Sequence, residues 1–347
     1  MLSNLLQRWF PKRTVAVSEN YLPVIPFEGF DGGLDLERRT EDVRFSPSGR
    51  RLCMVSTNGH LLALDLDITS NPIRIERWAE FKSDALLMPH GLDFLDEDKL
   101  VIANRAGVVA VFNVPPADTW SAGMTLQPVH EMTSTWFGEK GATRLFEKRH
   151  IRCGPGSVRL AGDRLYVCCN NRATLTAHAF RFNGADIVID EGINHFPDAF
   201  GLPDGIAVSR NLRFLAVSDH AKNCISVFSL AGHQHIATLR DPELAHPHGL
   251  CFDATGTMLY AADAGSRLLH IFNFSGDAWK GEINQASARI MAVDDWAYRK
   301  TRGSVLEAYR SLEGGIKGID LDPTGKIIAT TCQNQLLRFF SATPART

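Results

Sequence analysis

One pattern of apolar and polar positions recurs six times along the chain. Each copy opens with a short stretch that alternates apolar and other positions, and a turn with Gly, Asp or Asn leads into a nearly all-apolar stretch such as LYVCC (165–169) or FLAVS (214–218). A polar turn and a third stretch ending in an aromatic residue follow. Short strands bounded by such turns are typical of an antiparallel meander. The copies begin at Glu41, His90, Gly156, Asp204, His248 and Lys317.

Six such sheets, each completed by a more variable fourth strand, predict an all-β fold, a single six-bladed β-propeller domain over residues 1–347. At about 42 residues per blade the repeats need roughly 250 residues, which leaves a remainder for insertions. The last copy ends near Phe340 with little chain after it. We therefore expect the N-terminal segment to supply the outer strand of the last blade, at TVAVS (14–18).

The spacing of the copies places two long loop insertions on one face of the disc. His90 and Gly156 are 66 positions apart and His248 and Lys317 are 69 apart, whereas other neighbouring starts are 44 to 49 apart. The links between blades lie on the face where the inner strands begin, so the insertions stand at the channel mouth, and enlarged loops on one face mark a binding face. We predict a helix near 304–312 in the second insertion. The aromatic side chains expected to roof the mouth are Trp136 and Phe137, or Trp296 and Tyr298.

Composition and charge narrow the classes of function. Hydrophobic residues make up 44% of the chain and charged residues 22%, which is the balance of a globular protein with a core. A formal net charge of −2 argues against nucleic acid or an anionic membrane as a partner. No apolar run is long enough to span a bilayer, and the start lacks a signal-peptide pattern. The seven cysteines are odd in number and scattered, which favours reduced thiols and a cytoplasmic location.

The first residue of each inner strand should line the channel mouth. These six residues form a ring that could bind a metal ion or a substrate. Two imidazoles come from opposite blades, and so do two carboxylates, which together are a normal ligand set for Zn²⁺, Fe²⁺ or Mn²⁺ rather than Ca²⁺. We predict a metal held by His90, His248 and Asp204. The alternative is a water-filled channel in which the polar side chains are structural. Lys317 argues against a cation on the axis, and it would neutralise Glu41 or Asp204 or meet an anionic substrate.

Further roles follow from position near this ring. Glu41, Asp204 or His246 could serve as the general base. Residues in turns on the same face could bind substrate, because a guanidinium holds a carboxylate through two hydrogen bonds. Asp219 and Asp263 are more typical of turn-bracing residues. The residues that we expect to bind substrate are Arg105, Arg172, Lys317 and Asn170.

The repeats also resemble known families. PHGLCFDATGTMLYAADAGSRLLHIFNF (247–274) and LPDGIAVSRNLRFLAVSDHAKNCISVF (202–228) are similar to NHL-type propeller repeats. The chain resembles the regucalcin–gluconolactonase superfamily, which holds lactonases, organophosphate hydrolases and strictosidine-synthase-like proteins, and this resemblance implies a metal in the channel mouth. Asp204 in PDG matches that superfamily's calcium-binding Asp. His90 and His248 resemble the Pro-His motifs in which peptide-amidating lyases hold zinc.

The sequence departs from both families. The Asn ligands of gluconolactonases are not evident at the inner-strand starts, and the third histidine of the lyases is missing. GxSxG, HExxH and P-loop motifs are absent from the sequence. We expect a metal-dependent enzyme that acts on a small ester-like or lactone-like substrate. The alternatives are a non-catalytic propeller that binds a protein or peptide, and a metal-free condensing enzyme or lyase on the same scaffold.

Overall fold

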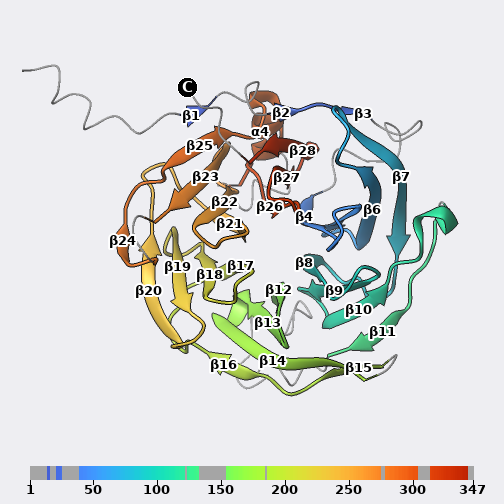
Figure 1. Cartoon of the computed structure of the whole chain (residues 1–347), viewed down its shortest axis with the longest axis horizontal. Helices are drawn as coiled ribbons and strands as arrows, with labels where there is room; N and C mark the ends of the chain where they lie inside the picture. Colours follow the sequence, from blue (N-terminus) through green and yellow to red (C-terminus); the bar gives the residue numbers. More distant parts are fainter. Residues whose placement is uncertain are drawn as a thin grey trace, which may run out of the picture.

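Six β-sheets stand around a central axis in the computed structural model of the chain (Figure 1). The colours follow one another around the ring, so sheets that succeed one another in sequence are neighbours in space. The predicted all-β, six-bladed propeller is therefore confirmed, and the blades are numbered here by the order of their inner strands. The structure describes residues 14–15, 21–25, 39–121, 123–132, 154–183, 186–274, 278–303 and 313–342.

The inner strands line the channel, and neighbouring inner strands approach each other closely. A Cβ atom on Gly205 would lie 1.9 Å from the carbonyl oxygen of His248, and one on Gly249 would lie 2.4 Å from that of Lys317. Glycine is required there because real Cβ atoms do not come so close, which explains the Gly of the Pro-His-Gly and Pro-Asp-Gly motifs. The inner strands are β4 (Thr40–Phe45), β8 (Pro89–Phe94), β12 (Pro155–Ala161), β17 (Pro203–Val208), β21 (Pro247–Phe252) and β26 (Gly318–Leu321).

The second and third strands of each blade pack against the sheets on both sides, which is why they are nearly all apolar. Val101 of blade two and Leu165 of blade three belong to one fully buried cluster between their blades, and burying such a side chain stabilises the fold by about 1.5–3 kcal/mol. The second strands are β5 (Arg51–Ser56), β9 (Lys99–Asn104), β13 (Arg164–Cys169), β18 (Phe214–Asp219), β22 (Met258–Asp263) and β27 (Ile327–Cys332). The third are β6 (His60–Asp67), β10 (Val109–Asn113), β14 (Thr174–Asn183), β19 (Cys224–Ser229), β23 (Leu268–Asn273) and β28 (Gln335–Ser341).

The outer strands vary more in length, and an additional parallel strand from elsewhere in the chain joins those of blades one, four and five. β3 (Val24–Ile25) joins blade one and β24 (Gly281–Ile283) joins blade four. The outer strands are β7 (Ile73–Lys82), β11 (Pro128–Glu131), β15 (Asp186–Ile189) with β16 (Ile193–His195), β20 (Gln234–Leu239), β25 (Ala288–Met291) and β2 (Tyr21–Leu22).

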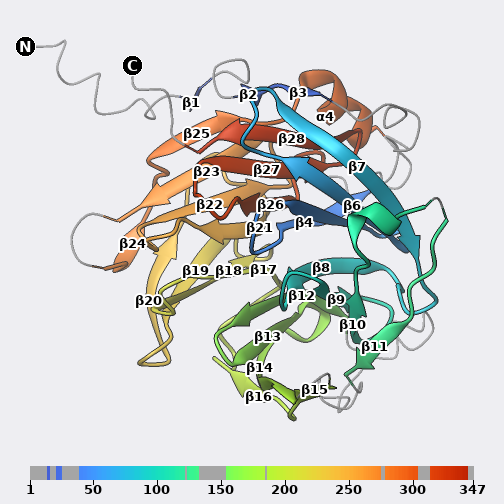
Figure 2. The same ribbon diagram turned by 45° about the vertical axis from the view of Figure 1, so that its right-hand side comes forward.

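The three described N-terminal strands lie at the rim of three different blades (Figure 2). β2 pairs antiparallel with β28, with Tyr21 opposite Phe340, and so adds the outer strand of blade six. The prediction that residues 14–18 form this outer strand is wrong, because β1 (Thr14–Val15) pairs parallel with β25 of blade five. Strands of two residues are too short for an apolar pattern to identify their partner.

The two insertions are described only in part. The first, with Trp136 and Phe137, lies outside the described residues, and so does the helix expected near 304–312. The second contains helix α4 (Asp295–Arg302), where Tyr298 donates a hydrogen bond to the carbonyl of Gly265 at 2.9 Å. Trp296 is 61% exposed and lies under the ammonium of Lys300, so its ring faces solvent. Among the described helices, none is long and apolar enough to cross a membrane.

Candidate functional site

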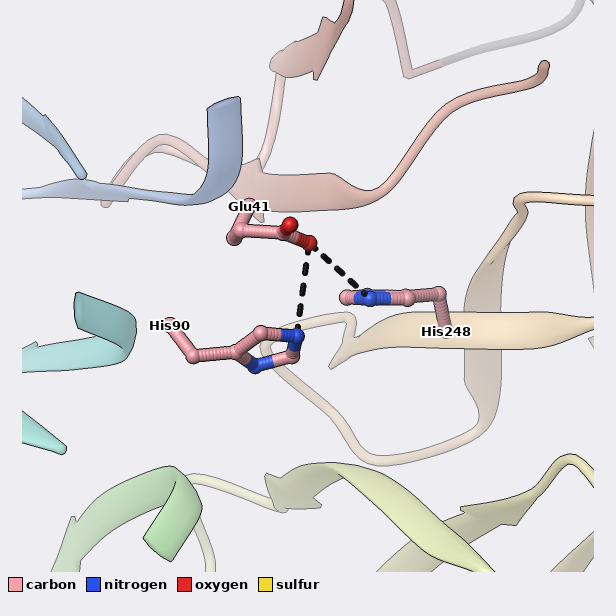
Figure 3. Close-up of side chains that lie close together, drawn as sticks. All are labelled: Glu41, His90 and His248. Atoms are coloured by element: carbon pink, nitrogen blue, oxygen red, sulfur yellow. Dashed lines mark ion pairs between the residues drawn. The ribbon is translucent and has the colours of Figure 1, made fainter. Parts of the chain in front are cut away.

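Glu41, His90 and His248 meet at the channel mouth (Figure 3). The Oε2 atom of Glu41 lies 3.3 Å from Nε2 of His90 and 3.5 Å from Nε2 of His248. The centroids of the two imidazole rings are 5.1 Å apart. All three side chains are buried. The repeat thus brings together three residues that are far apart in sequence, because each occupies the same position in its inner strand.

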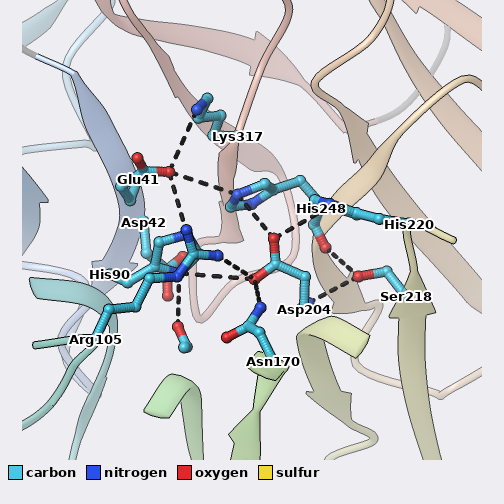
Figure 4. Close-up of polar contacts among 12 residues, drawn as sticks. Glu41, Asp42, His90, Arg105, Asn170, Asp204, Ser218, His220, His248 and Lys317 are labelled. Atoms are coloured by element: carbon cyan, nitrogen blue, oxygen red, sulfur yellow. Dashed lines mark hydrogen bonds and ion pairs between the residues drawn. The ribbon is translucent and has the colours of Figure 1, made fainter. Parts of the chain in front are cut away.

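Asp204 completes the cluster from blade four (Figure 4). Its Oδ1 atom accepts hydrogen bonds from Nδ2 of Asn170 at 2.7 Å and from Nη2 of Arg105 at 3.3 Å. Its Oδ2 atom lies 3.1 Å from Nε2 of both His248 and His220. One carboxylate oxygen is therefore held in place, and the other is directed at two imidazoles.

His220 is a third histidine of the cluster, in a mouth-facing turn, and it is not among the metal ligands expected from the sequence. It does not begin an inner strand but follows β18, in the turn between the second and third strands of blade four. Asp219 fixes this turn, because its carboxylate accepts hydrogen bonds from the main-chain N–H groups of Gly201, Leu202 and Lys222. The signal in the sequence was an Asp-His pair at a mouth-facing turn, and only the fold shows that this turn reaches the channel.

Protonation states follow from burial and from neighbours. The Nδ1 atom of His90 lies 2.7 Å from the carbonyl oxygen of Gly156, which can only accept a hydrogen, so Nδ1 carries the proton and Nε2 presents a lone pair. Burial, with Arg105 nearby, lowers the pKa of His90. Burial likewise lowers the pKa of His220 to about 4. Both imidazoles are therefore neutral at pH 7.

The carboxylates of the cluster are ionised. Burial alone would raise the pKa of Glu41, but Arg39, Lys317 and His90 outweigh it and hold this pKa well below its usual range. The pKa of Asp204 is also well below its usual range, because its histidine neighbours and Arg105 outweigh burial.

A network of ion pairs supports Glu41 from one side. Its Oε1 atom contacts Nε of Arg39, and its Oε2 atom lies 3.5 Å from Nζ of Lys317. Glu313 joins both cations, at 2.7 Å from Arg39 Nη2 and 2.7 Å from Lys317 Nζ. Arg39 and Glu313 were missed at the sequence level because neither occupies a repeat position. From the sequence, Lys317 could neutralise a ring carboxylate or meet an anionic substrate. The structure places its ammonium beside Glu41.

Several buried polar atoms in this cluster lack a hydrogen bond. In the described part of the chain they include Oε2 of Glu41, Nε2 of His90, Oδ2 of Asp204 and Nε2 of His220. A carboxylate oxygen and an unprotonated imidazole nitrogen both carry lone pairs, so they repel each other at 3.3 Å unless they share a cation. The arrangement suits either a proton or a metal ion.

The potential metal-ligand atoms form two groups, each of which could hold one metal ion. Glu41, His90 and His248 have ligand atoms within 4.8 Å of one another, and so do Asp204, His220 and His248. The expected ligands His90, His248 and Asp204 all lie in this cluster, but His90 and Asp204 belong to different groups that share His248. Each group offers two imidazoles and one carboxylate, a set that suits Zn²⁺, Fe²⁺ or Mn²⁺.

The remaining expected residues lie at the edge of the cluster. The ring of His246 is half-buried, with its centroid 5.2 Å from that of His220. Arg172 is half-buried in the short helix η4 (Asn170–Arg172), and it makes no hydrogen bond or ion pair with the cluster among the described residues. A Cβ atom on Gly156 would lie 1.6 Å from Oδ1 of Asn170, so the glycine at this ring position leaves room for the asparagine.

Comparisons with known proteins agree with the fold. Residues 153–293, which span blades three to five, match the family model described as Lactonase, 7-bladed beta-propeller. This part of the chain is lactonase-like. The β-propeller domain of Cps50 (Swd1) from Myceliophteria thermophila has a similar structure, with a TM-score of 0.51 over 88% of this chain and 84% of that chain at 11% identity, a likeness in fold alone. No curated protein matches the sequence. The ring here has six sheets rather than the seven in the family's description.

Proposed function

We propose that this protein is a metal-dependent hydrolase of small lactones or related esters, with its site at the channel mouth. The observation that carries the proposal is the convergence of two carboxylates and three histidines in a buried cluster. Within the described structure, Oε2 of Glu41, Oδ2 of Asp204 and the Nε2 atoms of His90 and His220 lack hydrogen bonds there. The lactonase-like stretch at 153–293 supports the reaction class.

Electrostatics favours one of the two metal positions. Lys317 and Arg39 already neutralise Glu41, and Lys317 Nζ lies 3.5 Å from the same oxygen that a metal would need. Asp204 instead keeps Oδ2 free of cationic neighbours, because Arg105 and Asn170 bind Oδ1. We therefore assign the metal to Asp204, His220 and His248.

The other residues would then act on water and substrate. A bound metal would lower the pKa of water and polarise a carbonyl group. Glu41, kept ionised beside His248, would accept the proton of the attacking water, and His90 would hold the second hydrogen through its Nε2 lone pair. Arg105 and Asn170 would orient Asp204, in the manner of groups that position metal ligands.

The test is metal analysis of protein purified without chelator, together with hydrolysis of a panel of five- and six-membered lactones and aryl esters. We expect bound Zn, Fe or Mn, and activity that falls after treatment with chelator and returns with the metal. His220→Ala should lose both metal and activity. His195→Ala should keep both, because the ring of His195 on β16 contacts Tyr166 and His233 rather than the cluster. A metal-free and inactive wild type would remove the hydrolase proposal and leave the binding propeller.

A further inference from the structure

A second ring of side chains lies three residues further along each inner strand, and it faces a separate cavity. This cavity has a volume of about 340 Å³, which falls within the range of small-molecule sites. The turns that follow β17, β21 and β26 border it, so it opens on the face opposite the histidine cluster. The residues of this second ring are Arg44, Asp93, Arg159, Ala207, Cys251 and Asp320.

A buried ion-pair layer separates this lower cavity from the mouth. The Oδ1 atom of Asp42 lies 3.3 Å from Nη2 of Arg44, and its Oδ2 atom lies 3.3 Å from Nη2 of Arg159. Above this layer, the space between Asp42 and the mouth residues is only about 10 Å³, about the room of one water molecule. The lower cavity is therefore not an extension of the histidine site.

The carboxylates that line the lower cavity are already used as hydrogen-bond acceptors by the main chain. Each accepts from at least one backbone N–H, at 2.6 to 2.9 Å, and thereby fixes an inter-blade contact or a turn. The carboxylates and their donors are Asp93 with Phe94 and Leu160, Asp320 with Phe45, Asp253 with Met258, and Asp322 with Ile327.

By contrast, the arginines at this cavity have N–H groups that are not fully used as hydrogen-bond donors. The side chain of Arg44 is only 4% exposed, and its Nη1 donates to the carbonyls of Val43 and Ile319. Its Nε atom makes no hydrogen bond within the described structure, and its Nη2 atom has an ion pair with Asp42 at 3.3 Å but no hydrogen bond. At the rim, Nη1 of the exposed Arg210 donates a long hydrogen bond, at 3.4 Å, to the carbonyl of Pro323. A buried guanidinium with unused N–H groups is costly unless an acceptor meets it, which points to a ligand that brings oxygen acceptors.

Protonation of two aspartates reduces the electrostatic repulsion that an anion would meet in this cavity. Burial, which outweighs Arg44, raises the pKa of Asp93 to about 7 and that of Asp320 to about 6. Both carboxyls are therefore partly protonated near neutral pH and then add hydrogen-bond donors. On the opposite wall, Ala207, Leu250 and Phe252 supply apolar surface for a short carbon chain.

We propose that this lower cavity is a second ligand site, which binds a small mono- or dicarboxylate through Arg44 and Arg210. The planar guanidinium matches a carboxylate through two parallel hydrogen bonds, and such charge-assisted pairs are the stronger ones. The site is independent of the chemistry at the histidine cluster, because the Asp42 layer lies between them.

Titration calorimetry at pH 6.5 tests this proposal with acetate, succinate, inorganic phosphate and methylammonium as probes. We expect wild-type protein to bind succinate and acetate, and to bind phosphate and methylammonium more weakly. Arg210→Glu should weaken succinate binding by roughly tenfold, about 1.4 kcal/mol. Arg74→Glu reverses an exposed charge on the outer strand of blade one, outside the lower cavity, so it should leave succinate affinity unchanged.

Ala207→Met is the second variant, since it fills the cavity from its apolar wall without changing a charge. It should abolish succinate binding, whereas Ala231→Met in an exposed turn of the same blade should not. Circular dichroism checks that each variant is folded, and if Ala207→Met fails to fold, Arg210→Glu decides alone. The proposal is overturned if no carboxylate binds, if phosphate or methylammonium binds in preference, or if folded Arg210→Glu and Ala207→Met bind succinate as tightly as the wild type.

Discussion

The imidazoles of His90 and His248 face each other across the channel, with ring centroids 5.1 Å apart, although they come from opposite blades of the propeller. Both belong to a Pro-His-Gly motif at the start of an inner strand. The glycine of each motif lets the neighbouring strand approach, and the histidine beside it is thereby turned into the channel. The repeated tripeptide thus has a packing residue and a site residue side by side.

Removing the imidazole of His248 should remove bound metal, since both possible metal positions share this residue. Its main chain stays in place because Ser218 donates to its carbonyl at 2.7 Å. We expect His248→Ala to lower metal affinity by roughly tenfold or more and to keep the propeller folded. Elemental analysis and thermal unfolding on the same samples measure both effects.

His246→Ala is the matched control for this change. His246 lies two positions earlier and outside both groups of ligand atoms, so its removal should leave the metal content unchanged. If His248→Ala keeps its metal, or if His246→Ala loses it, the ligand assignment is wrong.

Gly205→Ala should be strongly destabilising. The new Cβ atom would lie 1.9 Å from the carbonyl oxygen of His248, so the inner strands of blades four and five would have to separate. A cost of about 1–3 kcal/mol or more is expected from such overpacking. Gly232→Ala, in an exposed turn with no neighbour within 3.6 Å of the added atom, should be tolerated. Equal unfolding midpoints in urea for the two variants would contradict this account of the motif.

Asp93 should make stability fall as pH rises. Burial raises its pKa to about 7 in the folded protein, from an ordinary value of 3.8. Below about pH 4 both states are protonated. Between about pH 4 and pH 7 the unfolded carboxyl ionises while the folded one resists, and above about pH 7 the full penalty remains. Asp93→Asn should therefore gain stability relative to the wild type as pH rises through this window.

Denaturant unfolding at several pH values measures this slope. Asn keeps only one acceptor oxygen, so Asp93→Asn loses one of the two hydrogen bonds that Asp93 accepts from the N–H groups of Phe94 and Leu160. This loss adds an offset that does not depend on pH, so only the change with pH bears on the prediction. Parallel curves for the two proteins would show that Asp93 has an ordinary pKa.

Removal of the N-terminal strands should weaken ring closure. Deletion of residues 1–20 keeps β2 on β28, whereas deletion of residues 1–25 removes both β2 and β3. The longer deletion uncovers Phe340, which is fully buried and in edge contact with Tyr21. We expect it to lower the melting temperature by several degrees relative to the shorter deletion, and indistinguishable melting curves would show that β2 does not contribute.

The sequence repeat predicts some residues of the candidate site and not others. His90, Asp204 and His248 could be predicted from the sequence because each occupies the same position in its repeat. Equivalent positions in different blades lie at the same depth in the channel. His220 could not, since a turn residue reaches the channel only through the path that Asp219 imposes on its loop. Arg39 and Glu313 lie outside the repeats and contribute through side-chain reach.

The sequence alone determined the six sheets, the ring of channel residues and the glycines between them, because alternation and turn residues are local and recur in every blade. Only the tertiary structure decided that Lys317 neutralises Glu41, that His248 is shared by two groups of ligand atoms, and that Tyr21–Leu22 rather than residues 14–18 lies on the last blade. These are choices of partner among segments distant in the chain. They are settled by distances of a few ångströms between side chains and by strand pairs of two residues, for which no periodic pattern exists in the sequence.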